Sequence, residues 1–423
     1  MKELIEFFVE VGRLKSLKRR GWLMRDIADP ETVADHAYRV LFLAWIFSRG
    51  RAINTKKVLK MALVHSLSAV YIDYISPYDK LLEVKSYSEA QRRYPALVVR
   101  APVQVKELIQ TKRFQEEKKA LERLVKGLPE EISSKIIDLW IDFETSSSKE
   151  AKFLRTIDKL ENLLQAIDYR KQLRKEFLTP FWAQIREVTD DPKLVSFING
   201  LDQYFREGKA KKRTTQKMIE FIQKLGELKK IQRKGWVIRG IENPESLASH
   251  CFRTALIAWL LSTRKRVDKE VIIVMTLVHN LFAPVIGDTT PYDKLTKVAK
   301  NEKRLFETLP WFGSRQGKEV LAVERLQTEA KALDKVISLL PDSLRREIKY
   351  LWLEYKTGAS KEARFARQID RIEGVIQAME YHEKDRSIPV KAFWLELKEL
   401  IDDPLLADFV QQMDYYFLQR GKQ

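Results

Sequence analysis

The sequence is poor in cysteine. Cys251 is the single cysteine among 423 residues, so the chain can form neither an internal disulfide framework nor a cysteine-based zinc site. A chain without paired thiols fits a reducing cytoplasm. Glycine and proline are also scarce, at 15 and 14 residues, whereas lysine, arginine and glutamate are abundant. This balance indicates a protein from a thermophile.

Long apolar runs are absent as well. None reaches about 18 residues, so we expect no membrane span. The start of the chain, MKELIEFFVEVGRLK, carries acidic residues and no small-residue cleavage site, so we expect no signal peptide. An apolar content of 45% and a charged content of 32% are typical of a soluble globular protein. The length predicts two to three domains.

Basic residues exceed acidic ones along the whole chain, and the net charge is +18. Residues 1–200 contribute 36 − 28 = +8 and the remainder 41 − 31 = +10, so the excess is not held in a tail. Such a field attracts polyanions such as RNA, DNA or nucleotides. The alternative is an ordinary solvated surface.

An internal repeat organises the chain. The segment LKRRGWLMRDIADPETVADHAYRVLFLAWIFS aligns with IQRKGWVIRGIENPESLASHCFRTALIAWLLS at an offset of 214 residues. Further on, DLWIDFETSSSKEAKFLRTIDKLENLLQAIDY aligns with YLWLEYKTGASKEARFARQIDRIEGVIQAMEY at an offset of 212. Repeats of this kind indicate one domain used twice. We predict domains at 1–207 and 218–423, joined by a basic linker at 208–217.

Both copies have the pattern of helices. Apolar residues recur at spacings of three and four, and no stretch alternates strictly over the length of a strand. Asp29 and Asn243, each followed by Pro-Glu, are predicted to cap helices that begin at the proline. The sequence therefore predicts an all-α fold of two tandem domains, which we expect to pack as a pseudo-dimer.

Histidine is scarce, and its placement is selective. Four of the five histidines lie at matched positions on apolar helix faces, and each copy adds one aspartate in an apolar run. The predicted sets are His36, His65 and Asp158 in the first copy and His250, His279 and Asp370 in the second. Imidazole and carboxylate are good ligands for a first-row divalent metal. Alternatively, these histidines are satisfied core residues, and Lys or Arg pairs with each aspartate.

An ordered series of segments makes a family resemblance specific. GWxxR, PExxxxH, LVH, PYDK, LWxxY/F, EAxF and IDxxExxxQAxxY, in this order, resemble the HD-domain metal phosphohydrolases and especially their 5′-deoxynucleotidase-like branch. The resemblance covers about 170 residues of each copy. It implies an all-helical fold, a divalent metal and hydrolysis of deoxynucleoside monophosphates. It also implies that the two predicted sets are the metal ligands, with Asn280 beside them.

Several catalytic positions depart from the family pattern. Ser66 and Asn280 stand where the resemblance implies the aspartate of the His-Asp pair. Ala69 and Ala283 stand where it implies a glutamate that handles the attacking water. The Gly-Asp that follows is Asp73-Tyr74 in the first copy. It is retained only in the second copy, as Gly287-Asp288, so Asp288 is the remaining candidate for a catalytic acid or base.

Other residues could bind the substrate or a nucleic acid. The candidates for phosphate or nucleotide binding are Trp22, Arg25, Arg39, Trp236, Arg239 and Arg253. The candidates for nucleic-acid binding in the linker are Lys209, Lys211, Lys212 and Arg213. The basic segments 91–112 and 297–325 suit single-stranded nucleic acid or are ordinary solvated loops.

The lost carboxylates and the basic charge favour a catalytically degenerate HD protein, a pseudoenzyme that binds nucleic acid, with RNA or an RNA-containing assembly as the preferred partner. One alternative is a metal-dependent 5′-nucleotidase that uses only the second copy. Another is a nucleotide sensor that does not hydrolyse its ligand. The cofactor implied is Mn, Co, Mg or Zn, held weakly or not at all by the first copy. No membrane partner is expected.

Overall fold

A computed structural model describes residues 1–72, 103–173, 178–290, 293 and 315–420. Helices are the regular elements of this part of the chain, which carries no strand beyond the isolated bridges Lys18–Thr32 and Gln232–Ser246. The predicted all-α class is therefore confirmed. The chain divides into an N-terminal unit, Glu6–Val195, and a C-terminal unit, Ser196–Gln423 together with Met1–Ile5.

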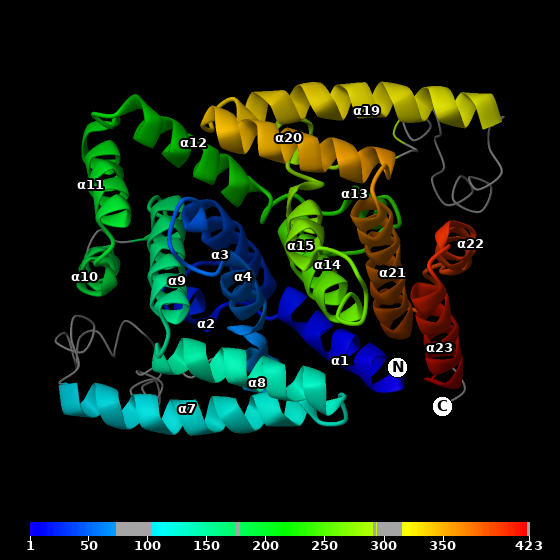
Figure 1. Ribbon diagram of the computed structural model, residues 1–423, viewed down its shortest axis with the longest axis horizontal. Helices are drawn as coiled ribbons and strands as arrows, with labels where there is room; N and C mark the ends of the chain where they lie inside the picture. The colour runs from blue at the N-terminus through cyan, green and yellow to red at the C-terminus, as the bar shows by residue number, and fades with distance from the viewer. Residues whose placement is uncertain (73–102, 174–177, 291–292, 294–314, 421–423) are drawn as a thin grey trace. The chain divides into compact units, whose positions relative to one another are not determined.

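The helices of the first repeat belong to the N-terminal unit, except that the first and the last of them each extend across a boundary between the units. Figure 1 labels most of them along the chain. They are α1 (Lys2–Gly12), η1 (Arg13–Lys15), α2 (Arg20–Leu23), α3 (Val33–Ser48), α4 (Thr55–Val64), η2 (Leu67–Val70), α7 (Val103–Val125), α8 (Glu130–Thr145), α9 (Lys149–Asp168), α10 (Thr179–Val188) and α11 (Pro192–Glu207). Helix α3 packs on α4 and α9, and α9 also contacts α8 and α10.

The second repeat reproduces this order. Its helices are α12 (Arg213–Glu227), α13 (Lys234–Val237), α14 (Leu247–Leu261), α15 (Lys269–Val278), α16 (Ala283–Ile286), α19 (Arg315–Ile337), α20 (Asp342–Thr357), α21 (Lys361–Lys384), α22 (Lys391–Leu400) and α23 (Pro404–Arg420). Helix α14 packs on α15 and α21, as α3 does on α4 and α9. The division at Val195 precedes the predicted linker, whose residues from Arg213 onward belong to α12. The pseudo-dimer and the exact domain limits stay predictions.

The central helices α3 and α14 begin later than predicted. Thr32 caps α3 through the backbone amide of Asp35, and the Asp35 side chain accepts from the Thr32 amide, which completes a capping box. Ser246 caps α14 in the same position. The expected caps Asp29 and Asn243 lie three residues earlier, and the Pro-Glu segments that follow them are not helical. The glutamate of each segment accepts a hydrogen bond from a tryptophan side chain. Every residue of α3 and α14 is buried, which places His36 and His250 in the core.

One segment corrects the expectation about apolar runs. Lys269–Ile286, which covers α15 and α16, spans 18 residues with a mean hydropathy of 1.6. By length and composition alone it could cross a membrane. However, 61% of it is buried inside the protein, as in a core helix.

Candidate functional site: two His-His-Asp clusters

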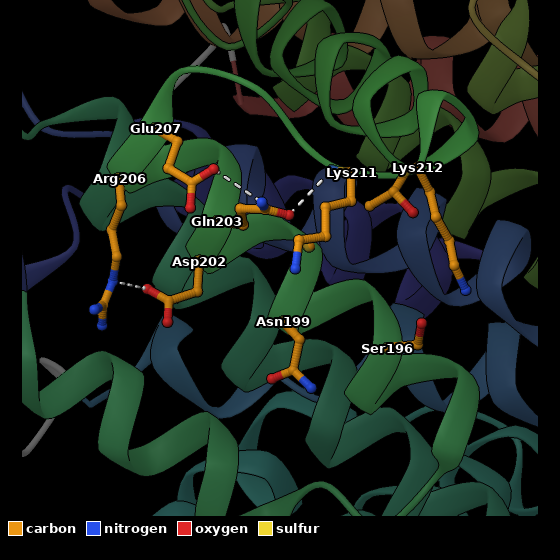
Figure 2. A pocket seen from close by; sticks show the side chains of 10 residues that line it. Ser196, Asn199, Asp202, Gln203, Arg206, Glu207, Lys211 and Lys212 are labelled. Carbon is orange, nitrogen blue, oxygen red and sulfur yellow. Dashed lines mark hydrogen bonds and ion pairs between the residues drawn. The ribbon is translucent and has the colours of Figure 1, made fainter.

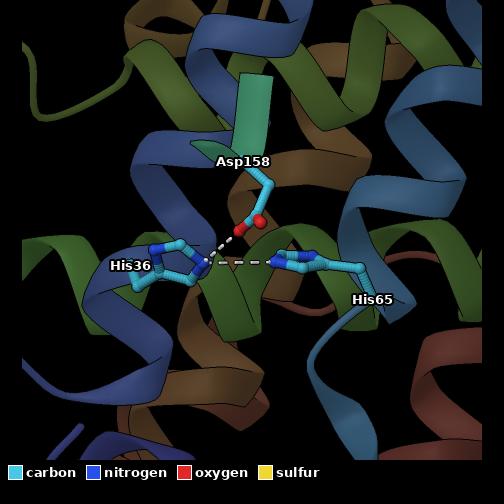
Figure 3. Close-up of side chains that lie close together, drawn as sticks. All are labelled: His36, His65 and Asp158. Carbon is cyan, nitrogen blue, oxygen red and sulfur yellow. Dashed lines mark hydrogen bonds and ion pairs between the residues drawn. The ribbon is translucent and has the colours of Figure 1, made fainter. Parts of the chain in front are cut away.

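The first predicted set comes together in the N-terminal unit. His36 lies on α3, His65 ends α4 and Asp158 lies on α9 (Figure 3). His36 Nε2 is 3.1 Å from Asp158 Oδ1 and 3.5 Å from His65 Nε2. One ligand atom of each residue can be chosen so that all lie within 4.8 Å of one another. Three helices that pack on one another therefore aim three potential ligands at one point.

The second set forms the same cluster in the C-terminal unit. His250 Nε2 is 2.8 Å from Asp370 Oδ1, and His279 Nε2 is 3.6 Å from the same oxygen. Both histidines are buried, and so is most of Asp370, which is 12% exposed at its side chain. The structure therefore brings together the residues of each predicted set, and their role as metal ligands stays a prediction.

The second histidine of each cluster has a defined proton position. His65 Nδ1 lies 2.7 Å from the Ala62 carbonyl, and His279 Nδ1 lies 2.7 Å from the Thr276 carbonyl. A carbonyl only accepts, so the proton is on Nδ1 and the lone pair of Nε2 faces the cluster. Burial lowers the pKa of His65 to about 4 and that of His279 to about 3, which keeps both rings neutral.

A buried glutamate holds the first histidine of each cluster. His36 Nδ1 contacts Glu161, and His250 Nδ1 is 2.5 Å from Glu373 Oε2. Burial and Arg19 lower the pKa of His36, but Glu161 and Asp158 outweigh them and raise it. The sequence pattern assigns no role to these glutamates. They were visible as the matched Glu of the IDxxExxxQAxxY segment, although the pattern did not show what they touch.

Two of the predicted phosphate-binding arginines have another role. Arg39 donates from Nε to Glu161 at 2.9 Å, from Nη2 to Gln165 at 2.8 Å and from Nη1 to Asp168 at 2.6 Å. Arg253 makes the matching contacts with Glu373, Gln377 and Glu380. Both guanidinium groups are fully buried. The assignment of Arg39 and Arg253 to phosphate is therefore wrong, since each nitrogen is already bound to the core network.

The predicted tryptophan and arginine pairs form packed clusters. Trp22 is buried, donates from Nε1 to Glu31 at 2.9 Å and stacks on Phe181, over which Arg25 also lies. Trp236 and Arg239 repeat this arrangement with Glu245 and Phe393. The clusters therefore anchor the glutamate at the start of α3 and α14. Whether they also touch a substrate stays a prediction.

An arginine that we had not singled out lies beside each first histidine. Arg19 Nη1 donates to Glu31 at 3.0 Å and to Asn162 at 2.8 Å, and it lies 3.2 Å from His36 Nδ1. Arg233 Nη1 lies 2.5 Å from His250 Nδ1. Its side chain is 22% exposed. The sequence marks Arg19 and Arg233 only by their matched positions in the segments LKRRGW and IQRKGW.

Asp288 is held in a half-buried position. Gly287, with φ +77°, ends α16 in a backbone conformation that favours glycine and turns the chain into Asp288. The carboxylate accepts from the amides of Lys234 at 2.8 Å and Thr289 at 2.9 Å. Burial raises the pKa of Asp288. The corresponding Asp73-Tyr74 lies outside the described residues, as do most of the basic segments 91–112 and 297–325.

At the positions that depart from the family pattern, only the second cluster has a polar side chain that reaches a predicted metal ligand among the described contacts. The Asn280 amide lies 2.8 Å from His279 Nε2, at the point that the other ligands face. The amide nitrogen donates to the lone pair of His279 Nε2 and also lies 3.9 Å from Cys251 Sγ, so the amide would have to turn before its oxygen could face a cation. Ser66 in the first cluster is partly exposed, and Ala69 and Ala283 bring no polar group.

The basic linker residues do not build a uniform positive surface. Lys211 and Lys212 line a groove of about 460 Å³ with residues of α11 and α12, in the C-terminal unit (Figure 2). The same groove contains Asp202 and Glu207, and Arg206 is paired with Asp202 at 2.8 Å. Lys209 and Arg213 are exposed nearby in sequence. Acidic side chains among the basic ones would repel a nucleic-acid backbone.

Comparison with known proteins decides the family. The HD domain model matches residues 11–193 and 225–399. The chain belongs to the HD-domain family. Within this family it resembles the 5′-deoxynucleotidase-like branch, as the sequence predicted. The mouse (Mus musculus) protein "5′-deoxynucleotidase HDDC2" is 32% identical over 166 residues, which cover 39% of this chain and 70% of the relative.

Two further proteins are similar to this chain over about the length of one repeat. The Schizosaccharomyces pombe protein "5′-deoxynucleotidase hdd1" is 27% identical over 206 residues, which cover 47% of this chain and 92% of the relative. A solved structure, a conserved hypothetical protein from Pyrococcus furiosus, is 25% identical and covers 47% of this chain and 99% of its own, with a TM-score of 0.35.

These relatives overturn the predicted function. Their names state phosphohydrolase activity, which supports the nucleotidase alternative, and nothing in them supports a nucleic-acid-binding pseudoenzyme. HD domains are metal-dependent, and the two His-His-Asp clusters have the residue types and the spacing that fit a metal ion. Four of the six pairs of ligand atoms are 2.8 to 3.6 Å apart, and in each cluster all three atoms lie within 4.8 Å of one another. Ligands bonded to one ion at about 2.0–2.2 Å have this spacing.

Proposed function

We propose that the chain is a metal-dependent phosphohydrolase that removes the phosphate from deoxynucleoside 5′-monophosphates in its C-terminal unit. The carrying observation is the His250, His279 and Asp370 cluster. It is the ligand set of a catalytic rather than a structural metal site, because three protein ligands leave a position open. The names of the relatives support the substrate class.

The donor set favours a first-row divalent ion such as Mn, Co or Zn over Mg, because imidazole is a poorer ligand for Mg. When bound, such an ion supplies an activated water and charge that stabilises the phosphate. His250 and His279 would offer Nε2, and Asp370 a carboxylate oxygen. Asn280 would add at most a neutral oxygen, where the family pattern has a carboxylate. The N-terminal cluster has only Ser66 at that position and would hold an ion more weakly.

Asp288 and Arg233 would act on the substrate. Two backbone amides hold the half-buried carboxyl group of Asp288, and burial raises its pKa, so Asp288 is the candidate acid or base. Arg233 is a cation with part of its surface exposed beside His250, where it would bind a phosphate oxygen. Arg19 matches Arg233 in the N-terminal unit, but Tyr74 stands where the second repeat has Asp288, which is why we assign the reaction to the C-terminal unit.

Phosphate release from the four deoxynucleoside monophosphates tests this proposal, with metal-stripped protein to which each divalent ion is returned. We expect Asp370→Asn to reduce turnover at least about 100-fold, because a metal ligand loses its charge. The matched variant Asp158→Asn should retain most of the activity. A wild-type protein that releases no phosphate with any of these ions would refute the proposal. Equal loss in both variants would refute the assignment to the C-terminal unit.

A further inference from the structure

Glu373 divides its two oxygens between a histidine and an arginine. Oε2 lies 2.5 Å from His250 Nδ1, and Oε1 accepts from Arg253 Nε at 2.9 Å. The carboxylate is completely buried. The N-terminal unit repeats this geometry, in which Glu161 contacts His36 Nδ1 and accepts from Arg39 Nε at 2.9 Å.

A second group competes for the same ring nitrogen. Arg233 Nη1 lies 2.5 Å from His250 Nδ1, and Arg19 Nη1 lies 3.2 Å from His36 Nδ1. A guanidinium group can only donate, whereas a carboxylate can only accept. If the arginine prevailed, Nδ1 would carry the lone pair and the neutral ring would keep its proton on Nε2. If the glutamate prevails, Nδ1 keeps the proton and the lone pair is on Nε2.

The two tautomers differ in what they offer to the cluster. Nε2 is the nitrogen that faces Asp370, at 2.8 Å, and only a ring with its lone pair there can bind a cation. We propose that Glu373, and Glu161 in the N-terminal unit, are positioning residues that select the metal-binding tautomer of His250 and His36 against the neighbouring arginine. This inference rests on metal binding in the proposed function but not on the nucleotidase reaction.

Arg253 makes glutamine an informative replacement. In a Glu373→Gln variant, the amide oxygen would turn to Arg253, which can only donate. The amide nitrogen would then donate to His250 Nδ1 and stabilise the wrong tautomer. The change keeps the size of the side chain, so its effect on metal binding reports the tautomer rather than a cavity.

Glu245→Gln is the matched control. Glu245 and Glu373 are both buried, and Arg233 Nη1 lies 4.0 Å from Glu245 and 3.9 Å from Glu373. Either variant therefore removes one buried negative charge at the same distance from Arg233. Only Glu373 makes a hydrogen bond with the histidine among the described contacts of these two glutamates.

The experiment measures Zn²⁺ and Co²⁺ affinity of the full chain by chelator competition, without nucleotide, in an Asp158→Asn background that weakens the N-terminal cluster. We expect Glu373→Gln to weaken binding about 10- to 100-fold and Glu245→Gln by less than about threefold. Equal effects of both variants, no effect of Glu373→Gln, or no binding by the parent protein would overturn the inference.

If Glu373→Gln fails to fold, the comparison moves to the N-terminal cluster, in an Asp370→Asn background. There Glu161→Gln is tested against Glu31→Gln, with the same expected order. Because no nucleotide is present, these results are distinct from the phosphate-release assay. If the protein releases no phosphate, but Glu373→Gln still weakens metal binding more than Glu245→Gln does, only the proposed reaction is refuted.

Discussion

The pairing of Arg51 with Asp191 predicts a pH-dependent contribution to the stability of the N-terminal unit. Arg51 donates to both oxygens of Asp191, from Nε and Nη2, each at 2.9 Å. Asp191 also accepts from the amide of Leu194 at 2.8 Å, at the start of α11. The hydrogen bonds from Arg51 are the main reason that the pKa of Asp191 falls to about 2. We therefore expect Asp191→Asn to destabilise the unit, since asparagine can cap the helix but cannot pair with the guanidinium.

The magnitude follows from the shift of the pKa. An unfolded aspartate titrates near 3.9, so the folded carboxylate contributes about 2 kcal/mol at neutral pH. A lowered pKa gives stability that is complete above the unfolded value and is lost as the pH falls through the folded value. The difference between wild type and Asp191→Asn should therefore be about 2 kcal/mol at pH 6 and roughly half of that near pH 3.

The assay is urea denaturation at several pH values, followed by a probe placed in the N-terminal unit, because a chain of two units need not unfold in one step. Asp403→Asn is the control in the second repeat. Asp403 pairs with the single ammonium of Lys265 and also accepts from two amides at the start of α23. It should not change the stability of the N-terminal unit. A wild-type-to-mutant difference that stays constant between pH 6 and pH 3 would refute the reasoning.

Two further predictions concern the C-terminal unit. Arg253→Met should destabilise it by about 3–5 kcal/mol in urea denaturation, because buried Glu373 and Glu380 lose their cation. The exposed Arg345→Met should cost less than about 1 kcal/mol, and similar losses would contradict the role of the buried network. Gly287→Ala should cost about 1–3 kcal/mol, because φ is +77° at Gly287, and it should reduce phosphate release by displacing Asp288. Gly50→Ala, at φ +69°, should strain the backbone without reducing phosphate release; unchanged activity in Gly287→Ala would argue against Asp288.

Repetition made the cluster residues predictable. Each His and Asp occurs twice in the same apolar setting, and helical spacing shows which face carries it. The helix starts were less predictable, because Asp29 and Thr32 are both good capping residues. The contacts of Glu31 favour Thr32 as the cap. The Glu31 side chain accepts from Trp22, and its backbone amide donates to Tyr169, which is 138 residues away. No local pattern reports such a contact.

The predicted function was wrong because a sequence shows which catalytic carboxylates are missing more clearly than it shows which other groups could act in their place. Ser66, Asn280, Ala69 and Ala283 are visible as missing carboxylates, and the charge of +18 suggests a polyanion. The groove beside the linker contains acids that lie among the lysines only after α11 and α12 have folded together. Charge summed over a sequence therefore does not predict the sign of a local surface.

By itself, the sequence determined the helical class, the duplication and the six side chains of the two clusters, because periodicity and repetition are local properties of a chain. Only the tertiary structure decided which groups surround those side chains. Arg39 and Glu161 are 122 residues apart, yet they share a hydrogen bond between buried side chains. Burial makes such a pair obligatory, because an unpaired charge there would be costly. That requirement makes Arg39 part of the core rather than a phosphate ligand.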